Sequence, residues 1–169
     1  MSKKVPDKAY FVEMVYTHIR ILYKICALYA AEEDRDDLKQ EIIYQLWKSY
    51  PSYRGDSKFQ SWMYRVALNT AMLGLRSRKL KYTRLHEHEM EIPDDLSEDQ
   101  EADFRVRQLY KQISKLNDLD KTIIFLYLEQ CSYEEIAEIT GITTKNVSVR
   151  LVRIREKIRK QLHLQNAKA

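Results

Sequence analysis

The sequence predicts an all-α protein with two small helical domains, the second containing a helix-turn-helix, joined by an acidic linker. Only 3 of the 169 residues are Gly and 3 are Pro, too few for the tight turns of a β-sandwich or barrel. Apolar residues recur at helical spacings of three and four, without strand-like alternation. Lys and Arg exceed Asp and Glu by 16 to 9 in residues 1–85 and by 13 to 7 in residues 104–169, whereas residues 86–103 hold 9 acids and no Lys or Arg. Two basic blocks around an acidic linker indicate two domains that each face a polyanion.

The first block predicts three helices. Apolar spacing predicts one helix from about residue 8 to residue 30. The acidic run 32–37 supplies the charge favoured at a helix start, and the second helix ends at Pro51. Ser57 and Gln60 have the spacing of a capping box for the third helix. The predicted inward residues of that third helix are Phe59, Trp62, Met63, Val66, Thr70 and Leu73.

The second block predicts two helices followed by a helix-turn-helix. Ser132 and Glu135 have capping-box spacing and open a short helix. Gly141 then suits a left-handed turn, and a long basic helix follows from Thr143 or Thr144. A short helix, a Gly-containing turn and a longer basic helix are typical of helix-turn-helix proteins. The predicted inward residues of the long helix are Val147, Leu151, Ile154, Ile158 and Leu162.

Composition excludes several classes of protein. No apolar run approaches the roughly 18 residues of a membrane span, and the first residues lack the apolar core of a secretory signal, so we expect neither membrane insertion nor secretion. Cys26 and Cys131 lie in apolar stretches without metal-ligand spacing. They indicate core packing in the reducing cytoplasm.

Enzyme and metal functions have little support. The sequence has no Gly-rich phosphate loop, nucleophile elbow or HExxH motif, so we expect no catalysis and no cofactor. The acidic run 32–37 could attract a hard cation, but it lacks the ligand spacing of a calcium loop. His86 and His88 are metal-capable but have no second ligand cluster.

The last helix has the strongest functional signal. Residues 145–160 contain seven Lys or Arg and one acid. At 100° per residue the cations lie along one flank, which suits DNA phosphates, and shorter side chains near the helix start suit base edges. Val149 and Val152 face away from the core and would contact thymine methyl groups; the alternative is a solvated basic face. The predicted DNA contacts are Lys145, Asn146, Ser148, Val149, Arg150, Val152, Arg153 and Lys157.

The first block has a second signal, because seven aromatic residues lie within positions 44–64. Aromatic and basic side chains together favour single-stranded nucleic acid, since bases stack while cations follow the backbone. We expect Trp47, Phe59 and Trp62 in the core, and Tyr53 and Tyr64 at the surface. The predicted nucleic-acid contacts are Tyr53, Lys58, Tyr64, Arg65, Asn69 and Arg76.

The outer face of the second helix is a third candidate. Asp37, Gln40, Glu41, Tyr44 and Lys48 are spaced for one side of that helix. A docking surface has this pattern, and so does an ordinary solvated face.

Taken together, these segments resemble the extracytoplasmic function (ECF) group of bacterial RNA polymerase sigma factors. Residues 37–47, from Asp-Leu-Lys-Gln-Glu-Ile to Leu-Trp, resemble the segment that grips the polymerase clamp helices. Residues 59–71, Phe-Gln-Ser-Trp-Met-Tyr-Arg-Val-Ala-Leu-Asn-Thr-Ala, resemble the promoter-melting segment. Residues 133–158 resemble the helix-turn-helix for the upstream element. The core polymerase contacts implied by this resemblance are Asp37, Leu38, Gln40, Glu41, Tyr44 and Trp47.

The resemblance implies a factor that binds core RNA polymerase, recognises two promoter elements, helps open the DNA and is held by an anti-sigma factor. It assigns core binding, the downstream element and melting to residues 1–85, and the upstream element to residues 104–169. It also implies that the acidic linker 86–103 runs through the polymerase cleft.

The chain departs from the family at its predicted base-reading positions. Ser148 stands where the family often has Arg, and Thr143, Lys145 and Asn146 stand where it often has Pro, Gly and Thr. The upstream sequence that is read is therefore left open. The alternative function is a stand-alone helix-turn-helix regulator whose first block serves for dimerisation or sensing.

Overall fold

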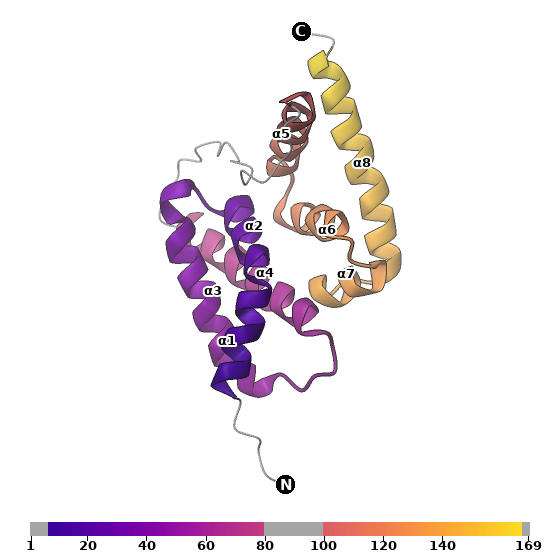
Figure 1. Cartoon of the computed structure of the whole chain (residues 1–169). Coiled ribbons are helices and arrows are strands. Elements are labelled where there is room, and N and C mark those ends of the chain that lie inside the picture. The colour runs from indigo at the N-terminus through magenta and orange to yellow at the C-terminus, as the bar shows by residue number, and fades with distance from the viewer. Residues whose placement is uncertain (1–6, 80–99, 167–169) are drawn as a thin grey trace. The chain divides into compact units, whose positions relative to one another are not determined.

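The computed structural model describes residues 7–79 and 100–166, with their side chains for residues 7–74 and 104–164. The chain divides into two compact units, Met1–His86 and Glu87–Ala169, which Figure 1 shows as helical bodies. Every regular element within the described ranges is helical, and these ranges contain no strand. The predicted all-α class is confirmed.

In the first unit, α2, α3 and α4 pack on one another. The ring of Phe11 on α1 contacts Trp47 and Tyr50 at centroid distances of 5.1 and 5.0 Å, which seats α1 on the end of α3. The core is apolar, with Leu22, Ile42 and other large side chains fully buried. The elements of this unit are α1 (Lys8–Thr17), α2 (Ile19–Tyr29), the 3-10 turn η1 (Glu32–Asp34), α3 (Arg35–Ser49), the 3-10 turn η2 (Tyr50–Ser52) and α4 (Phe59–Lys79).

The predicted single helix from residue 8 to 30 is wrong, because the chain breaks at His18. His18 has φ −110° and ψ 17°, outside the helical region. At the preceding residue, the Thr17 hydroxyl donates to the Glu13 carbonyl at 2.9 Å, a bond that bends helices. The break lets Phe11 and Val15 face the core, while Val12 is 46% exposed.

The inward face of α4 also differs from the prediction. After Met63 the buried line runs through Ala67, Leu68 and Ala71, whereas Leu73 is 62% exposed. Small alanines allow neighbouring helices to approach closely, so the contact face of α4 is marked by small side chains. A prediction of the inward face of α4 from its largest apolar residues therefore selects the wrong side of the helix in its second half.

The two predicted capping boxes have different outcomes. At α7, the Ser132 N–H donates to Glu135 Oε2 at 2.9 Å and the Glu135 N–H donates to Ser132 Oγ at 3.1 Å, so this box is confirmed. At α4, the Tyr53 hydroxyl donates to the Ser57 carbonyl at 2.8 Å. This bond closes the turn around Ser57, and the helix begins only at Phe59, too late for the predicted box.

In the second unit, α5, α6 and α7 each pack against the long helix α8, which runs along them in Figure 1. Helix α5 begins at Gln100, inside the predicted linker, whose earlier part, residues 86–99, lies outside the described residues, as do His86 and His88. The elements are α5 (Gln100–Ser114), α6 (Asp118–Leu128), α7 (Tyr133–Thr140) and α8 (Thr144–Asn166).

Within the described ranges, no helix is both long and apolar enough to cross a bilayer. The described side chains, which include the acidic run 32–37, contain no group of three His, Cys, Asp or Glu arranged to hold a metal. Cys26 is buried and Cys131 is half-buried, and neither forms a disulfide bond among the described residues.

Candidate nucleic-acid interface

Helix α8 begins at a position fixed by its cap and by the turn before it. Gly141 ends α7 in the left-handed region at φ 74°, as predicted. The Thr143 hydroxyl then accepts from the Asn146 N–H at 3.2 Å, and the Thr143 carbonyl accepts from the Val147 N–H at 3.0 Å. Thr143 is therefore the N-cap residue of α8, and α7, the turn and α8 form a helix-turn-helix.

The rotation of α8 about its axis is set by its buried side chains. Val147, Leu151, Ile154 and Ile158 are at most 6% exposed, which confirms the predicted inward face, and Leu162 is half-buried. Because these residues face α5, α6 and α7, the opposite side of α8 faces solvent.

The solvent side of α8 carries most of the predicted DNA contacts. Val149 and Val152 are 42% and 58% exposed, so two apolar side chains face water in a stretch of α8 whose other apolar residues, from Val147 to Ile158, are buried. Ser148 lies half-buried beside them. The exposed members of the predicted set are Lys145, Asn146, Val149, Val152, Arg153 and Lys157.

The cations of α8 fall into two groups. Arg155 lies over the Tyr127 ring at 5.6 Å. Arg159 and Lys160 contact Glu156 at 2.8 and 3.6 Å, and the Arg159 hydrogen bond lowers the pKa of the Glu156 carboxyl. These cations near the C-terminal half have intramolecular partners, whereas Arg153 and Lys157 have no ion-pair partner among the described residues.

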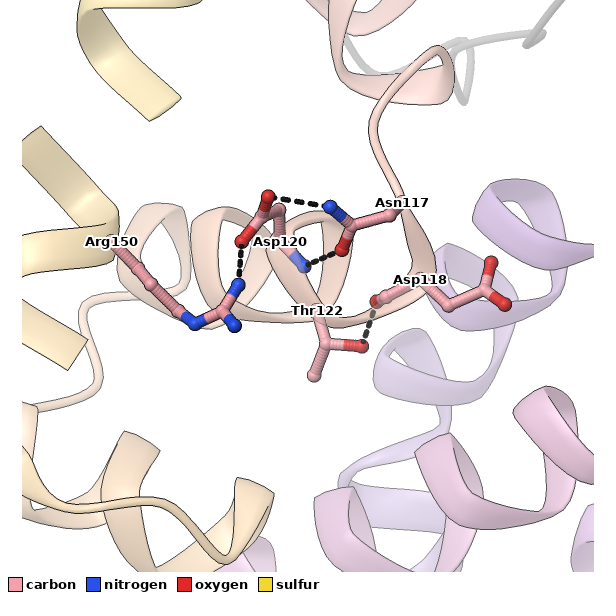
Figure 2. A network of polar contacts seen from close by, with 5 residues as sticks. All are labelled: Asn117, Asp118, Asp120, Thr122 and Arg150. Atoms are coloured by element: carbon pink, nitrogen blue, oxygen red, sulfur yellow. Dashed lines mark hydrogen bonds and ion pairs between the residues drawn. The ribbon is translucent and has the colours of Figure 1, made fainter. Parts of the chain in front are cut away.

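Arg150 is the exception among the predicted phosphate contacts. Its guanidinium donates to Asp120, at the start of α6, at 2.7 Å (Figure 2). The sequence prediction missed Asp120 and its neighbour Asn117. The spacing of these two residues is itself a helix-start signal, but nothing in the sequence connects them with a side chain 30 positions away.

The outer face of α3 presents the predicted polar patch. Asp37, Gln40, Glu41 and Tyr44 are exposed, with Tyr44 at 56%. Leu38 was predicted to contact a partner, but it is 6% exposed and packs in the core. Its position on the helix faces α2 and α4, so it supports the patch from beneath.

Trp47 differs from the prediction that it is a core residue. It is 41% exposed, whereas Phe59 and Trp62 are buried as predicted. Its indole packs edge-on against Phe11 at 5.1 Å, so only part of the ring is covered. Trp47 therefore extends the outer face of α3 with an apolar group.

The predicted single-strand contacts on α4 and the preceding turn are only partly at the surface. Asn69 and Lys58 are exposed and Arg65 is half-buried. Tyr53 is half-buried, with its ring 5.1 Å from that of Trp62. Tyr64 is 1% exposed, so its predicted surface role is wrong; it adjoins Met63 on the inward side of α4. The side chain of Arg76 lies outside the described residues.

Comparison with known proteins matches a family model to each of the two units. The family described as Sigma-70 region 2 matches residues 14–80, and Sigma-70, region 4 matches residues 106–158. The RNA polymerase sigma factor SigV of Bacillus subtilis is 32% identical over 164 residues, covering 96% of this chain and 96% of the relative. The ECF RNA polymerase sigma factor SigW of the same organism is 28% identical over 172 residues, covering 94% and 92%.

A solved structure is similar over most of the chain. The sigma factor RpoE from Bartonella quintana, in complex with the anti-sigma factor NepR, matches with a TM-score of 0.76 and 18% identity, covering 92% of this chain and 98% of that chain. At this identity the likeness shows the fold alone.

Proposed function

The chain belongs to the ECF group of sigma-70 factors, and from this premise we propose how its surfaces divide the work of transcription initiation. As a sigma factor it binds core RNA polymerase and directs promoter recognition, DNA opening and initiation. We assign core binding, the downstream element and melting to residues 1–85, and the upstream element to residues 104–169.

The upstream element is read by the solvent side of α8. The observation that carries this assignment is the pair of exposed valines among exposed polar and basic groups, on a helix whose opposite side is buried from Val147 to Ile158. A helix placed in the major groove presents short side chains to base edges and longer cations to phosphates. Asn146 suits an adenine edge, and Val149 and Val152 suit thymine methyl groups.

The test is the salt dependence of holoenzyme binding to a duplex promoter fragment. Each phosphate contact contributes roughly 0.9 to the slope of log K against log salt. Arg153→Ala should weaken binding and lower the slope by roughly one. Filter binding over a series of salt concentrations measures both quantities.

Arg159→Ala is the matched control, because Arg159 lies on the same helix but is paired with Glu156 at 2.8 Å. It should leave the slope near that of the original chain. Equal slopes for the Arg153 and Arg159 variants would contradict the assignment of α8 to the upstream element.

The core enzyme is bound by the outer face of α3, with Asp37, Gln40, Glu41 and Tyr44 as polar contacts and Trp47 as an apolar one. Support comes from the exposure of all five side chains on one helix. Such a mixture of an aromatic anchor and a polar rim is typical of protein interfaces.

The melted strand is held by the exposed side of α4 and the turn before it, through Asn69, Lys58, Arg65 and Tyr53. Arg76, further along the same helix, would add a cation to this surface. Exposure of Asn69 and Lys58 supports the proposal, since strand capture needs accessible hydrogen-bonding and basic groups.

We infer an anti-sigma factor as a further partner, since the RpoE of similar fold was solved with one. We also infer a cytoplasmic location, because core RNA polymerase works there.

A further inference from the structure

Arg150 differs from the exposed cations of α8 because it is bonded to another helix of its own unit. Its Nη1 donates to Asp120 Oδ1 at 2.7 Å, and the two side chains are 40% and 20% exposed. Figure 2 shows the Arg150 side chain reaching from α8 to the first turn of α6. Since 30 positions separate the two residues, the contact ties together two helices.

The Asp120 carboxylate is held independently of Arg150. Asn117, the N-cap residue of α6, donates from Nδ2 to Asp120 Oδ2 at 2.7 Å, and its Oδ1 accepts from the Asp120 N–H at 2.9 Å. Figure 2 shows Asn117 and Arg150 meeting Asp120 from opposite sides. The carboxylate also lies in the first turn of α6, where the helix dipole favours a negative charge. Both of its oxygens are therefore engaged, and its direction is fixed.

Helix α6 is a firm base for this carboxylate. Thr122 and Ile123 are at most 1% exposed, and the Thr122 hydroxyl donates to the Asp118 carbonyl at 2.9 Å. On α8, Arg150 directly precedes the fully buried Leu151 and follows the exposed Val149. A bond at Arg150 thus acts on the border between the packed side and the solvent side of α8.

We propose that Asp120 is a positioning residue for promoter reading, and that Arg150 serves as its bridge to α8 and not as a phosphate contact. This inference rests on the proposed upstream interface. Base-reading side chains must be held within about 0.5 Å of their working geometry. The buried apolar side chains set which side of α8 faces out, and the directional bond to Asp120 fixes its remaining rotation and slide.

The rival interpretation is that Arg150 contacts a phosphate and Asp120 competes for it. The two interpretations give opposite results for Asp120→Asn. Removal of a competing acid beside a phosphate contact should strengthen DNA binding. Removal of the charge of a positioning acid should weaken DNA binding, because the ion pair with Arg150 is lost and the reading side chains are displaced.

The experiment uses holoenzyme formed from the full chain and core RNA polymerase. The DNA is a duplex promoter, chosen from a randomised library as the sequence that this holoenzyme transcribes most strongly. Affinity is measured over a series of salt concentrations for Asp120→Asn, Arg150→Gln and the double variant. Asp118→Asn is the matched control, since it removes the same charge from the same helical turn while Figure 2 shows its carboxylate pointing away from Arg150. Arg153→Ala reports a true phosphate contact.

We expect Asp120→Asn and Arg150→Gln each to weaken binding about tenfold, with the salt slope unchanged. The double variant should be no weaker than either single variant, because both lose the same bond. Asp118→Asn should bind as the original chain does. Melting of the free variants by circular dichroism checks folding, and if Asp120→Asn is unfolded, the slope of the half-exposed Arg150→Gln decides by itself.

Tighter or unchanged binding by Asp120→Asn, or a slope lowered by roughly one in Arg150→Gln, would overturn the positioning role while leaving the upstream interface intact. No effect of Arg153→Ala on either affinity or slope would overturn the interface, and the positioning role with it.

Discussion

The Cys26 thiol is a single group whose chemistry is set by burial. It is 2% exposed, and burial raises its pKa from 9.0 to about 11, against the opposing effect of Lys39 and Arg35. In the unfolded chain the thiol ionises near pH 9.0, whereas in the folded chain it keeps its proton until about pH 11. Between these values the unfolded state has fewer bound protons than the folded state, so the stability of the first unit falls as the pH rises.

We therefore expect Cys26→Ala to be less stable than the original chain at pH 7, by about 1 kcal/mol for the lost volume. That difference should shrink between pH 9 and pH 11, where only the cysteine chain has this thiol to ionise. Urea unfolding at a series of pH values measures the difference. If the free energy of unfolding changed with pH in the same way for both chains, the Cys26 thiol would have the same pKa in the folded and unfolded states, against this prediction.

Asn69 is a residue whose exposure allows a test of DNA melting. Its amide lies at the surface of α4 and can bond a base or backbone group of a separated strand. Extrusion of a base costs a few kcal/mol that such contacts must offset. Asn69→Ala should leave the closed complex intact and reduce the open complex about fivefold, the effect of about 1 kcal/mol. Permanganate reactivity of unpaired thymines measures the open complex.

The Asn69 defect should largely vanish on a template with a pre-melted bubble. Gln60→Ala is a suitable control, because this exposed amide lies on the opposite side of the same helix. Equal defects of Asn69→Ala on duplex and bubble templates would show that the residue is structural.

At the level of single residues, the sequence predicts the buried aliphatic residues of α8 well and the burial of aromatic side chains only in part. Phe59 and Trp62 are buried as expected, but Trp47 is 41% exposed and Tyr64 is 1% exposed. Aromatic side chains occur both in buried cores and at exposed binding surfaces. Residue type alone therefore does not show which of the two places an aromatic residue occupies. The Asp120–Arg150 bond was beyond prediction for a different reason, since it depends on how two distant helices pack.

At the level of elements, two glycines provide a matched pair. Gly141 ends α7 at φ 74°, whereas Gly74 lies within α4, and a Cβ at either position would meet nothing within 4 Å. Both positions therefore have room for a side chain, and only their backbone conformations differ. Gly141→Ala should destabilise the second unit by about 1–2 kcal/mol, because a Cβ disfavours the left-handed region. Gly74→Ala should stabilise the first unit by about 0.5–1 kcal/mol, because alanine favours a helix interior.

Urea unfolding followed by circular dichroism measures both glycine effects. Gly141→Asn is the control, because asparagine tolerates the left-handed region better than alanine, and its cost should be smaller. The same sign for Gly141→Ala and Gly74→Ala would contradict the assignment of the two effects to backbone conformation.

Element boundaries were predictable where local chemistry decides them. The Ser132 box, the turn at Gly141 and the start of α8 all depend on residues within four positions, and all were predicted. The break at His18 and the late start of α4 involve tertiary packing as well as the local bonds of Thr17 and Tyr53: Phe11 reaches α3, and the Tyr53 ring packs against Trp62. Sequence spacing alone does not show such contacts.

At the level of the whole molecule, the chain consists of two compact units, Met1–His86 and Glu87–Ala169. Each unit has its own buried core: helices α1 to α4 supply the first, and helices α5 to α8 supply the second. Domains of 60–80 residues can fold alone. The fragments Met1–His86 and Glu87–Ala169 should therefore each be helical and melt cooperatively.

The two fragments also test what the covalent connection contributes. We expect a mixture of both fragments with core RNA polymerase to transcribe a duplex promoter far less than the intact chain at the same nanomolar concentration. In the intact chain, binding of one unit gives the other a millimolar effective concentration near its own site, and separate fragments lack this advantage. Run-off transcription over a series of fragment concentrations should show recovery at high concentration. Equal activity of fragments and intact chain at nanomolar concentration would mean that tethering contributes nothing. Activity that does not recover at high fragment concentration would assign the acidic segment 86–103 a direct part in initiation, as its predicted path through the polymerase cleft requires.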